Sequence, residues 1–315
     1  MDKKDNVLST PIRNKTGKTM LIPPSPFMKK IGFGTGVCVY EYQRSPLASK
    51  IRSPWAIKKL SKSKKGDIHL NERLKWEAEV LRKLQHPNIV GFRAHLKSNA
   101  GNILAMEECS ACLGNLIEER RENGPLSPYS KNIIIKVGLD ISSALNYLHN
   151  TALILHCDIK SFNILIKGDF NICKLCDFGV CLPLKKDGTI DEEKAGDEYE
   201  YTGTPMWSPP EVMKFPQKVS SKADIYSFGL VLQEMLTLTI PITEDMMESM
   251  DISNEDEEEF DALAMNDSIE YPHIDMVVYK DIIDLINMCT SSEPKHRPSS
   301  RKLEGIFRGL TLKQT

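Results

Sequence analysis

The chain carries the stretch His156-Cys157-Asp158-Ile159-Lys160-Ser161-Phe162-Asn163, followed further on by Asp177-Phe178-Gly179. Asp158, Asn163 and Asp177 offer side-chain oxygens, which hard divalent cations prefer as ligands. Carboxylates, an amide and a lysine in this arrangement suit phosphoryl transfer, because that reaction needs positioning and charge neutralisation more than covalent work by the protein. The two stretches together predict a site for phosphate groups and metal ions.

In order and spacing the two stretches resemble the catalytic and metal-binding loops of protein kinases. Either stretch alone would be a weak signal, whereas both in sequence are a strong one. The resemblance implies that Asp158 accepts the proton of the attacking hydroxyl and that Lys160 lies beside the transferring phosphate of ATP. It also implies that Asn163 and Asp177 hold two Mg²⁺ ions.

A glycine-rich segment, Ile31-Gly32-Phe33-Gly34-Thr35-Gly36-Val37-Cys38-Val39-Tyr40, lies upstream. The alternation of Val37 and Val39 predicts a strand after the glycines, which favours a strand-turn-strand cover over phosphates rather than a dinucleotide fold. Val37 stands where the kinase pattern has its third glycine, so we assign it no phosphate contact. The residues predicted to bind the nucleotide here are Ile31, Gly32, Phe33, Gly34, Thr35, Gly36 and Val39.

Trp55-Ala56-Ile57-Lys58 resembles the strand that carries the phosphate-binding lysine of kinases, with Lys58 in that role. Its partner should come from the helix before His86-Pro87-Asn88. Two glutamates compete, and Glu79 lies about 200° around the helix from Glu77 at 100° per residue. The alignment on His86-Pro87-Asn88 favours Glu77 as the partner of Lys58.

The segment from Leu104 to Cys109 predicts a strand that enters the hinge of the kinase fold. By the same resemblance Met106 guards the back of the nucleotide pocket. Glu107 and Cys109 then offer backbone groups to the adenine.

Composition favours a compact enzyme and disfavours several other classes. The net charge of −2 argues against a nucleic-acid-binding protein. The start Met1-Asp2-Lys3-Lys4-Asp5 lacks an apolar signal region, and no apolar run approaches membrane-spanning length. The eight cysteines are scattered, which suits a reducing compartment. Cys173 and Cys176 form a CxxC pair, but zinc is disfavoured because residues three apart on a strand face opposite ways.

We predict an α+β chain with the bilobal protein kinase fold, a small β-rich lobe and a larger helical one. Two signals support the large lobe. The helix Asp224–Leu232 is apolar almost all round, as befits a buried helix, and Asp224 is expected to hold the catalytic-loop backbone. Arg297 resembles the buried arginine of kinases that pairs with the glutamate ending the activation segment, which implies a pair with Glu211. We predict a flexible tail over 1–26, a kinase domain over 27–308 and a C-terminal tail over 309–315. Within the kinase domain the small lobe covers 27–107 and the large lobe 108–308, with a solvated acidic insert at 244–261.

The segment Gly203–Glu211 supplies the peptide-positioning loop, which separates protein kinases from small-molecule kinases. The pairing of Lys160 with Thr204 favours serine/threonine transfer, although dual-specificity kinases of the MAP-kinase-kinase type share it. A pseudokinase scaffold is disfavoured because the lysine, the base and the metal ligands are all present. Protein substrates are therefore expected.

A closer resemblance rests on Ser25-Pro26-Phe27-Met28, Gly32–Val37, Ile166–Phe170 and the acidic insert, which are similar to the PDZ-binding kinases. These are mitotic kinases related to MAP kinase kinases. The resemblance implies a dual-specificity enzyme of the cytoplasm and nucleus that acts on a stress-activated MAP kinase. It also implies phosphorylation of Thr10 by a cyclin-dependent kinase. The chain ends Lys313-Gln314-Thr315, without the aliphatic end of a PDZ ligand, which argues against PDZ binding.

Cys157 stands where many kinases have the arginine that binds an activation-loop phosphate bidentately. A thiol is a poor phosphate partner. The sequence therefore predicts that activation-loop phosphorylation is not the main switch. The rival interpretation is that Lys185, Lys186 or Lys194 replaces the arginine.

Overall fold

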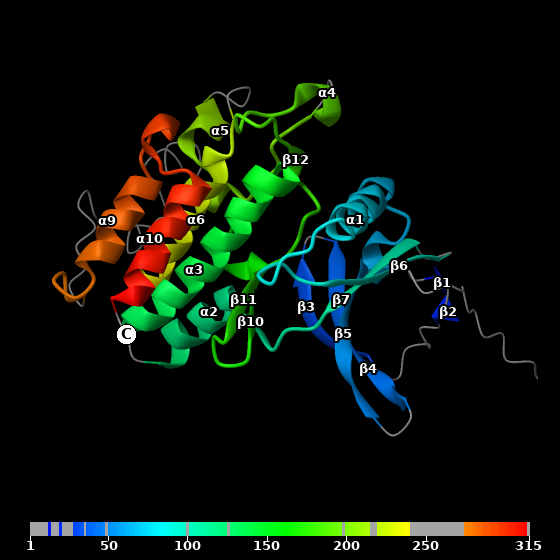
Figure 1. Ribbon diagram of the computed structural model, residues 1–315. Helices are drawn as coiled ribbons and strands as arrows, with labels where there is room; N and C mark the ends of the chain where they lie inside the picture. Colours follow the sequence, from blue (N-terminus) through cyan, green and yellow to red (C-terminus); the bar gives the residue numbers. More distant parts are fainter. Residues whose placement is uncertain are drawn as a thin grey trace, which may run out of the picture. The chain divides into compact units, whose positions relative to one another are not determined.

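The computed structural model describes residues 12–13, 19–20, 28–34, 36–47, 50–98, 101–124, 127–196, 199–214, 219–239 and 274–313. The predictions for Thr10, Thr35, the acidic insert 244–261 and the last two residues lie outside this set. The chain divides into two compact units (Figure 1). The smaller unit ends at Cys109, and the larger one comprises His86–Ile89 and the chain from Ser110 onwards.

The small unit is built on a five-stranded antiparallel sheet with the order β3-β4-β5-β7-β6. Its strands are β3 (Met28–Gly34), β4 (Val37–Leu47), β5 (Lys50–Leu60), β6 (Phe92–Ser98) and β7 (Gly101–Glu107). Trp55, Ile57 and Ala105 are buried members of one apolar cluster on this sheet. The predicted glycine-rich strand-turn-strand is therefore the β3–β4 hairpin.

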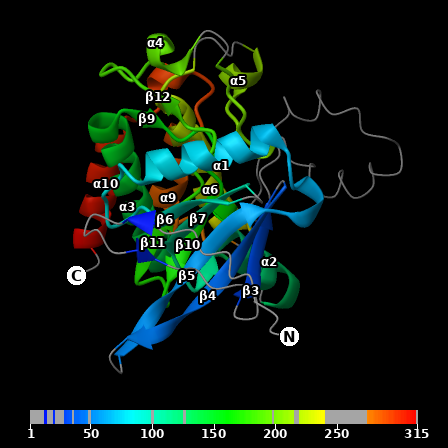
Figure 2. The same ribbon diagram turned by 90° about the vertical axis from the view of Figure 1, so that its right-hand side faces the viewer.

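Helix α1 (Ile68–Leu81) packs against β5, β6 and β7 of this sheet (Figure 2). Asp67 caps its first turn, because the Asp67 side chain accepts a hydrogen bond from Leu70 N at 3.1 Å. One side of this helix is apolar and buried, with Leu74 and Leu81 at most 2% exposed. This stripe sets which side of the helix faces the sheet.

Within the predicted flexible tail the structure pairs β1 (Ile12–Arg13) with β2 (Thr19–Met20) as an antiparallel ribbon. Ile and Thr favour extended backbone, which explains why these two short segments pair. A two-stranded ribbon of this length adds little stability by itself.

The large unit is mainly helical. Its longer helices are α2 (Leu113–Asn123), α3 (Lys131–Tyr147), α6 (Lys222–Thr237), α9 (Lys280–Cys289) and α10 (Ser300–Leu312). Its shorter elements include β8 (Ala111–Cys112), β9 (Ile154–Leu155), β10 (Ile164–Lys167), β11 (Ile172–Leu175), β12 (Leu182–Pro183), α4 (Glu192–Ala195) and α5 (Pro210–Lys214). Helix α10 packs on α3, and α9 packs on α6 (Figure 1).

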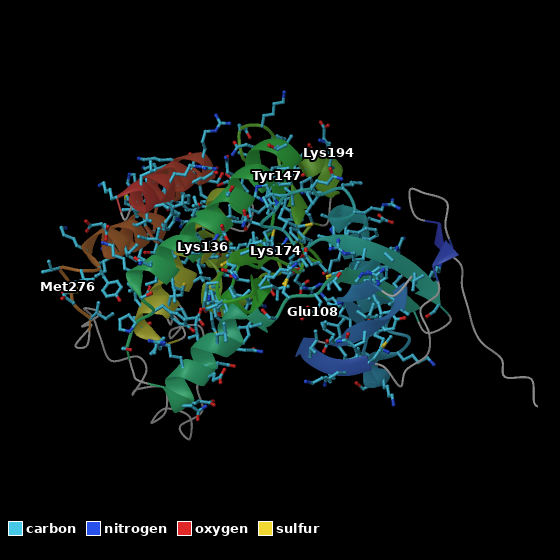
Figure 3. All side chains as sticks on the ribbon, turned by 60° about the horizontal axis from the view of Figure 1, so that its bottom comes forward. Glu108, Lys136, Tyr147, Lys174, Lys194 and Met276 are labelled. Carbon is cyan, nitrogen blue, oxygen red and sulfur yellow. The ribbon has the colours of Figure 1, made fainter. Side chains whose placement is uncertain are left out.

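Helix α6 is buried almost all round, as its sequence predicts. Lys194 on α4 and Met276 before α9 lie at opposite ends of the large unit (Figure 3). In the described part of the chain no helix is long and apolar enough to cross a membrane.

The short segment His86–Ile89 belongs with the large unit, whereas the sequence places it inside a continuous small lobe. The reason is its hydrogen bonding. Asn88 Nδ2 donates to Cys173 O at 3.0 Å, and Leu175 N donates to Asn88 O at 2.9 Å. Contacts between residues so distant in the chain are not visible in a local sequence pattern.

Helix α10 continues to Leu312, although the sequence places the end of the domain at residue 308. Phe307 anchors this helix. Its ring is fully buried, and the centroid lies 6.5 Å from that of Phe228 on α6. It also covers Gly138 on α3, where an added Cβ would stand 2.1 Å from the Phe307 ring.

We predict opposite effects for two glycine-to-alanine changes in this helical core. Gly138→Ala should lower the free energy of unfolding by about 1–3 kcal/mol, because the Phe307 ring must move in a packed interior. Gly305→Ala, on the exposed side of α10 with nothing within 4 Å of an added Cβ, should raise it by roughly 0.5–1 kcal/mol. Urea unfolding of both variants measures the difference. Equal stabilisation by both changes would contradict this packing.

Candidate active site

In the small unit, Lys58 of β5 pairs with Glu77 of α1. Lys58 Nζ lies 2.8 Å from Glu77 Oε2, and both residues are buried. Glu79 lies on another side of the helix and stays partly exposed. Of the two glutamates that the sequence offered, the structure thus pairs Glu77 with the lysine.

Three of the predicted nucleotide-binding positions form a line across the sheet. Gly32 on β3 is opposite Val39 on β4, and Val39 is opposite Lys58 on β5. Gly36 turns the hairpin with a φ of +76°, and an added Cβ there would stand 2.3 Å from Leu70 Cδ1. Only glycine suits this position. Phe33, Gly34 and Ile31 lie on β3, and Thr35 is outside the described residues.

The predicted hinge positions follow β7. Met106 is buried beside Ala56 of β5. Glu107 N donates to Gly91 O at 2.7 Å, and Glu107 Oε2 accepts from Gly91 N at 3.3 Å. This double contact fixes the end of the strand, and Cys109 ends the small unit two residues later.

In the large unit, the buried residue Asp158 is the centre of a partly buried hydrogen-bond network. Its Oδ1 accepts from Thr204 Oγ1 at 2.6 Å and from Thr204 N at 3.1 Å. Lys160 Nζ lies 3.0 Å from Asp158 Oδ2 and donates to Thr204 Oγ1 at 2.6 Å. The predicted pairing of Lys160 with Thr204 therefore exists and also includes Asp158.

The environment of Asp158 favours its ionised form. Burial alone would raise the pKa of the Asp158 carboxyl, but the ammonium group of Lys160 and the hydroxyl of Thr204 outweigh it, so the pKa is lowered. The carboxylate is charged at neutral pH and can accept a hydrogen bond from a hydroxyl group.

Asn163 ends the 3₁₀ turn η3 (Ser161–Asn163) and is oriented by Asp158. Asn163 Nδ2 donates to Asp158 O at 2.7 Å and to Asp158 Oδ2 at 2.9 Å. This leaves the amide oxygen of Asn163 as the atom that can bind a hard cation. Cys176 N donates to Asn163 O at 3.0 Å and so links this turn to the residue before Asp177.

Asp177 has a φ of +65°, a left-handed conformation that is uncommon outside glycine. The next residue, Phe178, is fully buried, with its ring centroid 5.0 Å from that of His156. His156 Nε2 lies 3.0 Å from Cys176 O. Asn163 and Asp177 supply an amide and a carboxylate, the oxygen donors that a divalent cation with phosphate ligands takes.

The CxxC pair lies next to this site, because Cys176 directly precedes Asp177 and its N–H donates to Asn163 O at 3.0 Å. Cys173 is buried on β11, and Cys176 follows the strand. Among the described residues no group of three or more His, Cys, Asp or Glu side chains could hold a metal ion.

The backbone of the catalytic loop is held by Asp224 of α6, as predicted. Asp224 Oδ2 accepts from His156 N at 2.9 Å, and Asp224 Oδ1 accepts from Cys157 N at 3.0 Å. Cys157 has a φ of +67°. Asp224 is fully buried and also lies 2.8 Å from His149 Nε2.

Cys157 lies in an apolar cluster that the segment after Asp177 covers. The cluster consists of Leu155, Cys157, Leu184, Ile190, Val219 and Ala223, with Tyr199 and Tyr201 packed against it. Burial raises the pKa of the Tyr201 hydroxyl well above its ordinary value. Gly203 follows, where an added Cβ would stand 2.4 Å from Cys157 O. The loop thus packs on Cys157 through apolar groups.

The end of this segment is anchored by the predicted ion pair between Glu211 and Arg297. Arg297 Nη1 and Nη2 donate to the two Glu211 oxygens at 2.6 and 2.7 Å. Arg297 is 1% exposed, and its guanidinium lies 4.7 Å from the centroid of the Tyr226 ring. A bidentate pair of this kind fixes orientation as well as distance.

One residue of this region was not singled out by the sequence analysis. Glu234 is a buried carboxylate on α6 that contacts Ser161 and Trp207. The available signal was a glutamate in a helix that is otherwise apolar almost all round, since a buried charge needs partners.

Comparison with known proteins gives consistent matches. The family described as protein kinase domain matches residues 26–305. The chain is 41% identical to human lymphokine-activated killer T-cell-originated protein kinase, over 95% of this chain and 92% of that protein. It is 30% identical to mitogen-activated protein kinase kinase kinase 12 of Rattus norvegicus, over 79% of this chain and 24% of the relative. It is 27% identical to dual specificity protein kinase shkD of Dictyostelium discoideum, over 97% of this chain and 37% of the relative.

Proposed function

The chain belongs to the protein kinase family and is a serine/threonine protein kinase, and we propose that Asp158 and Lys160 carry its catalytic step. The predicted kinase fold and the resemblance to the PDZ-binding kinases, of which T-cell-originated protein kinase is another name, are confirmed. The observation that carries the proposal is the partly buried network in which Asp158 is ionised and bonded to Lys160 and Thr204.

Asp158 is proposed to accept the proton of the substrate hydroxyl as that oxygen attacks the terminal phosphate of ATP. A carboxylate held in place by two hydrogen bonds from Thr204 needs little rearrangement for this step. Lys160 is proposed to neutralise charge on the transferring phosphate. Lys58, fixed by Glu77, is proposed to hold the α- and β-phosphates.

A protein kinase uses ATP and a divalent metal ion. We propose that Asn163 and Asp177 hold Mg²⁺, because an amide oxygen and a carboxylate suit a small hard cation. The bound metal would neutralise charge on the phosphate oxygens. The nucleotide is proposed to bind Ile31, Gly32, Phe33, Gly34, Thr35, Gly36, Val39, Lys58, Met106, Glu107 and Cys109.

The substrates are proteins, as for other members of the family. Finer assignments rest on the resemblance to mitotic kinases: a stress-activated MAP kinase as substrate, additional transfer to tyrosine, and modification of Thr10 by a cyclin-dependent kinase. The same resemblance is the basis for proposing a location in the cytoplasm and nucleus. Imaging of the tagged chain in dividing cells would test this.

We further propose that the segment after Asp177 is held mainly by apolar packing. Cys157 is fully buried in its cluster and offers no charge to a phosphate. Of the three lysines that could replace an arginine, Lys194 pairs with Asp191 at 2.6 Å. The run Asp191-Glu192-Glu193 would repel an added phosphate.

The first functional prediction concerns the catalytic residues. Asp158→Ala should reduce phosphorylation of a generic protein substrate by about 10²–10⁴-fold, the usual effect of losing a general base. Lys58→Met and Asp177→Ala should be comparably severe with the fold intact, and chelation should stop transfer until Mg²⁺ is restored. Radiolabelled ATP measures transfer, and Lys280→Met, at an exposed pair on α9, is the matched control. Full activity in any of the three variants would contradict the roles assigned to these residues.

The second functional prediction concerns the N-terminal segment. Arg13, Lys15 and Lys18 precede Met20-Leu21-Ile22, a basic-then-apolar order like that of MAP-kinase docking peptides. Deleting residues 1–24 should weaken phosphorylation of a stress-activated MAP kinase and spare a generic substrate. Loss of the same size on both substrates would refute docking.

The third functional prediction follows from the cluster around Cys157. Enzyme treated with phosphatase should keep most of its activity, because apolar contacts hold the loop without a phosphate. The measurement compares transfer rates before and after treatment, with mass spectrometry to verify loss of phosphate. Silencing by phosphatase, reproduced by mutating Tyr199, Tyr201 or Thr202, would show that the idea is wrong.

A further inference from the structure

The sheet of the small unit has two faces with different neighbours. Lys58 and its partner Glu77 on α1 lie at one face. Ile57 precedes Lys58 on β5, and successive side chains of a strand point to opposite faces. The face of Ile57 carries a cluster rich in aromatic rings, which we call the aromatic face. Its members are Met28, Tyr40, Tyr42, Trp55, Ile57, Ala94, Ile103 and Ala105.

The aromatic face is buried, although α1 packs on the other side of the sheet. Ile57 and Ala105 are fully buried, and Trp55 is 5% exposed. In the part of the small unit that the structure describes, no α-helix lies over this face. Because a sheet buries an apolar face against another layer, a segment outside the described residues should cover it.

Trp55 shows which chemistry the covering segment needs. Its Nε1 is buried and makes no hydrogen bond with a described residue. Leaving a buried donor unpaired is unfavourable, and an indole N–H can only donate. The Trp55 ring is held in place by Arg44, whose guanidinium lies 4.3 Å from the ring centroid. The segment that covers the aromatic face should therefore supply a hydrogen-bond acceptor.

The course of the N-terminal segment brings a candidate to this face. Strand β1 contacts β6, and its pairing with β2 puts Met20 opposite Ile12 (Figure 1). Met28 begins β3. Since β6 and β3 are the two edges of the sheet, Met20 and Met28 lie on opposite sides of it.

The length of the chain between these two methionines fits the width of the sheet. Four strand spacings of about 4.8 Å separate β3 from β6, which is about 19 Å in all. Met20 and Met28 are eight residues apart, and in polyproline II conformation they span about 25 Å at 3.1 Å per residue. The segment is therefore long enough to cross the sheet with little slack. Because α1 covers the other face, the aromatic face is the open route.

The sequence of this segment suits the aromatic face. It reads Leu21-Ile22-Pro23-Pro24-Ser25-Pro26-Phe27 and carries no charged side chain. Its prolines favour polyproline II and remove backbone donors, so carbonyl oxygens are left as acceptors. Pro23 and Pro26 are three residues apart and face the same side of a helix with three residues per turn. Segments with two prolines at this spacing bind surfaces lined by aromatic side chains.

Charge favours this segment over its neighbours in the tail. Lys59 Nζ lies 4.4 Å from the centroid of the Tyr40 ring, and Arg44 lies on Trp55 as described above. Two cations on the rings repel further basic residues, such as Lys15 and Lys18. An uncharged stretch meets no such repulsion.

We propose that residues 21–27 of this chain bind the aromatic face, with Pro23 and Pro26 toward its rings and a carbonyl oxygen accepting from Trp55 Nε1. This contact lies within the small unit and does not depend on phosphate transfer. Leu21 and Ile22 also end the basic-then-apolar order that resembles a docking peptide. These two side chains cannot contact the aromatic face and a partner protein at the same time, so binding to the face hides them from a partner.

Pro23→Ala/Pro26→Ala tests the contact in the full chain, with isotope-labelled tryptophan and NMR of the indole N–H groups. The Trp55 signal is identified by its absence in Trp55→Phe. Replacing both prolines should loosen the segment, so the Trp55 indole N–H should exchange with water about tenfold faster than in wild type. Pro11→Ala, in the same tail but outside the segment, is the matched control and should leave the exchange unchanged. Equal exchange in wild type and the double variant would overturn the proposal.

A photo-crosslink identifies the segment on the aromatic face directly. p-Benzoylphenylalanine replaces Tyr40, a partly buried aromatic member of the face, and mass spectrometry maps the crosslinked peptides. The crosslinks should join position 40 to residues 21–27 of the same chain. The same group in place of Trp76, which is 42% exposed on α1, should not reach this segment.

Three results of the crosslinking experiment would overturn the proposal. They are crosslinks to a second copy of the chain, seen as a dimer, crosslinks to the acidic insert 244–261, and no crosslink to residues 21–27. If the chain changed at Tyr40 does not fold, the indole exchange decides, because Pro23 and Pro26 lie outside the sheet.

Discussion

The buried carboxylate of Asp224 is the constraint on which the geometry of the catalytic loop depends. It accepts from two successive backbone N–H groups, those of His156 and Cys157, and contacts His149 Nε2. Removing a carboxylate from water costs several kcal/mol, so these hydrogen bonds are needed to offset it. In return the two adjacent N–H groups are forced toward one point, and Cys157 takes the left-handed conformation. The next residue, Asp158, then projects its side chain toward Thr204 and Lys160.

The conformation of the loop explains why the segment after Asp177 packs on it through apolar groups. With Cys157 turned into the cluster of Leu155, Leu184 and Ile190, the segment after Asp177 has an apolar surface on which to pack. An arginine at this place would bring a charge into this apolar cluster, where the oxygens of Asp224 already contact His149 Nε2 and the N–H groups of His156 and Cys157. Packing of Tyr201 and the close approach of Gly203 to Cys157 O then fix where Thr204 meets Asp158. The residue before Asp158 thus determines how the loop around Thr204 is supported.

The sequence predicted much of this arrangement, for identifiable physical reasons. Lys58, Asp158 and Asp177 are recognisable because phosphate and metal chemistry restricts which residues can stand at each spacing. The choice of Glu77 over Glu79 followed from the alignment on His86-Pro87-Asn88, and the ion pair at 2.8 Å agrees with it. Helix α6 was predicted because an apolar run of that length has to be buried.

Other features depend on contacts between distant parts of the chain and leave no local signal. Asn88 belongs to the large unit only because it bonds residues of β11, and α10 extends past the predicted domain end because Phe307 packs on α3. The cluster around Cys157 could be suspected from the missing arginine, but its members could not be listed. The role of each site residue in catalysis stays a prediction until it is measured.

Helix α6 explains how the loop around Asp158 keeps a fixed geometry although it has no regular secondary structure. Asp224 holds the residues before Asp158, and Glu234 holds the residue after Lys160. A segment of three residues fixed at both ends to one rigid element has few conformations left, so the entropy that catalysis would otherwise have to overcome is removed on folding. Because both anchors are carboxylates that accept from the loop, they satisfy the N–H groups of His156 and Cys157 and the hydroxyl of Ser161 in the interior. The fixed geometry of this loop therefore comes from helix α6, and a change that moves either anchor should shift the positions of Asp158 and Lys160.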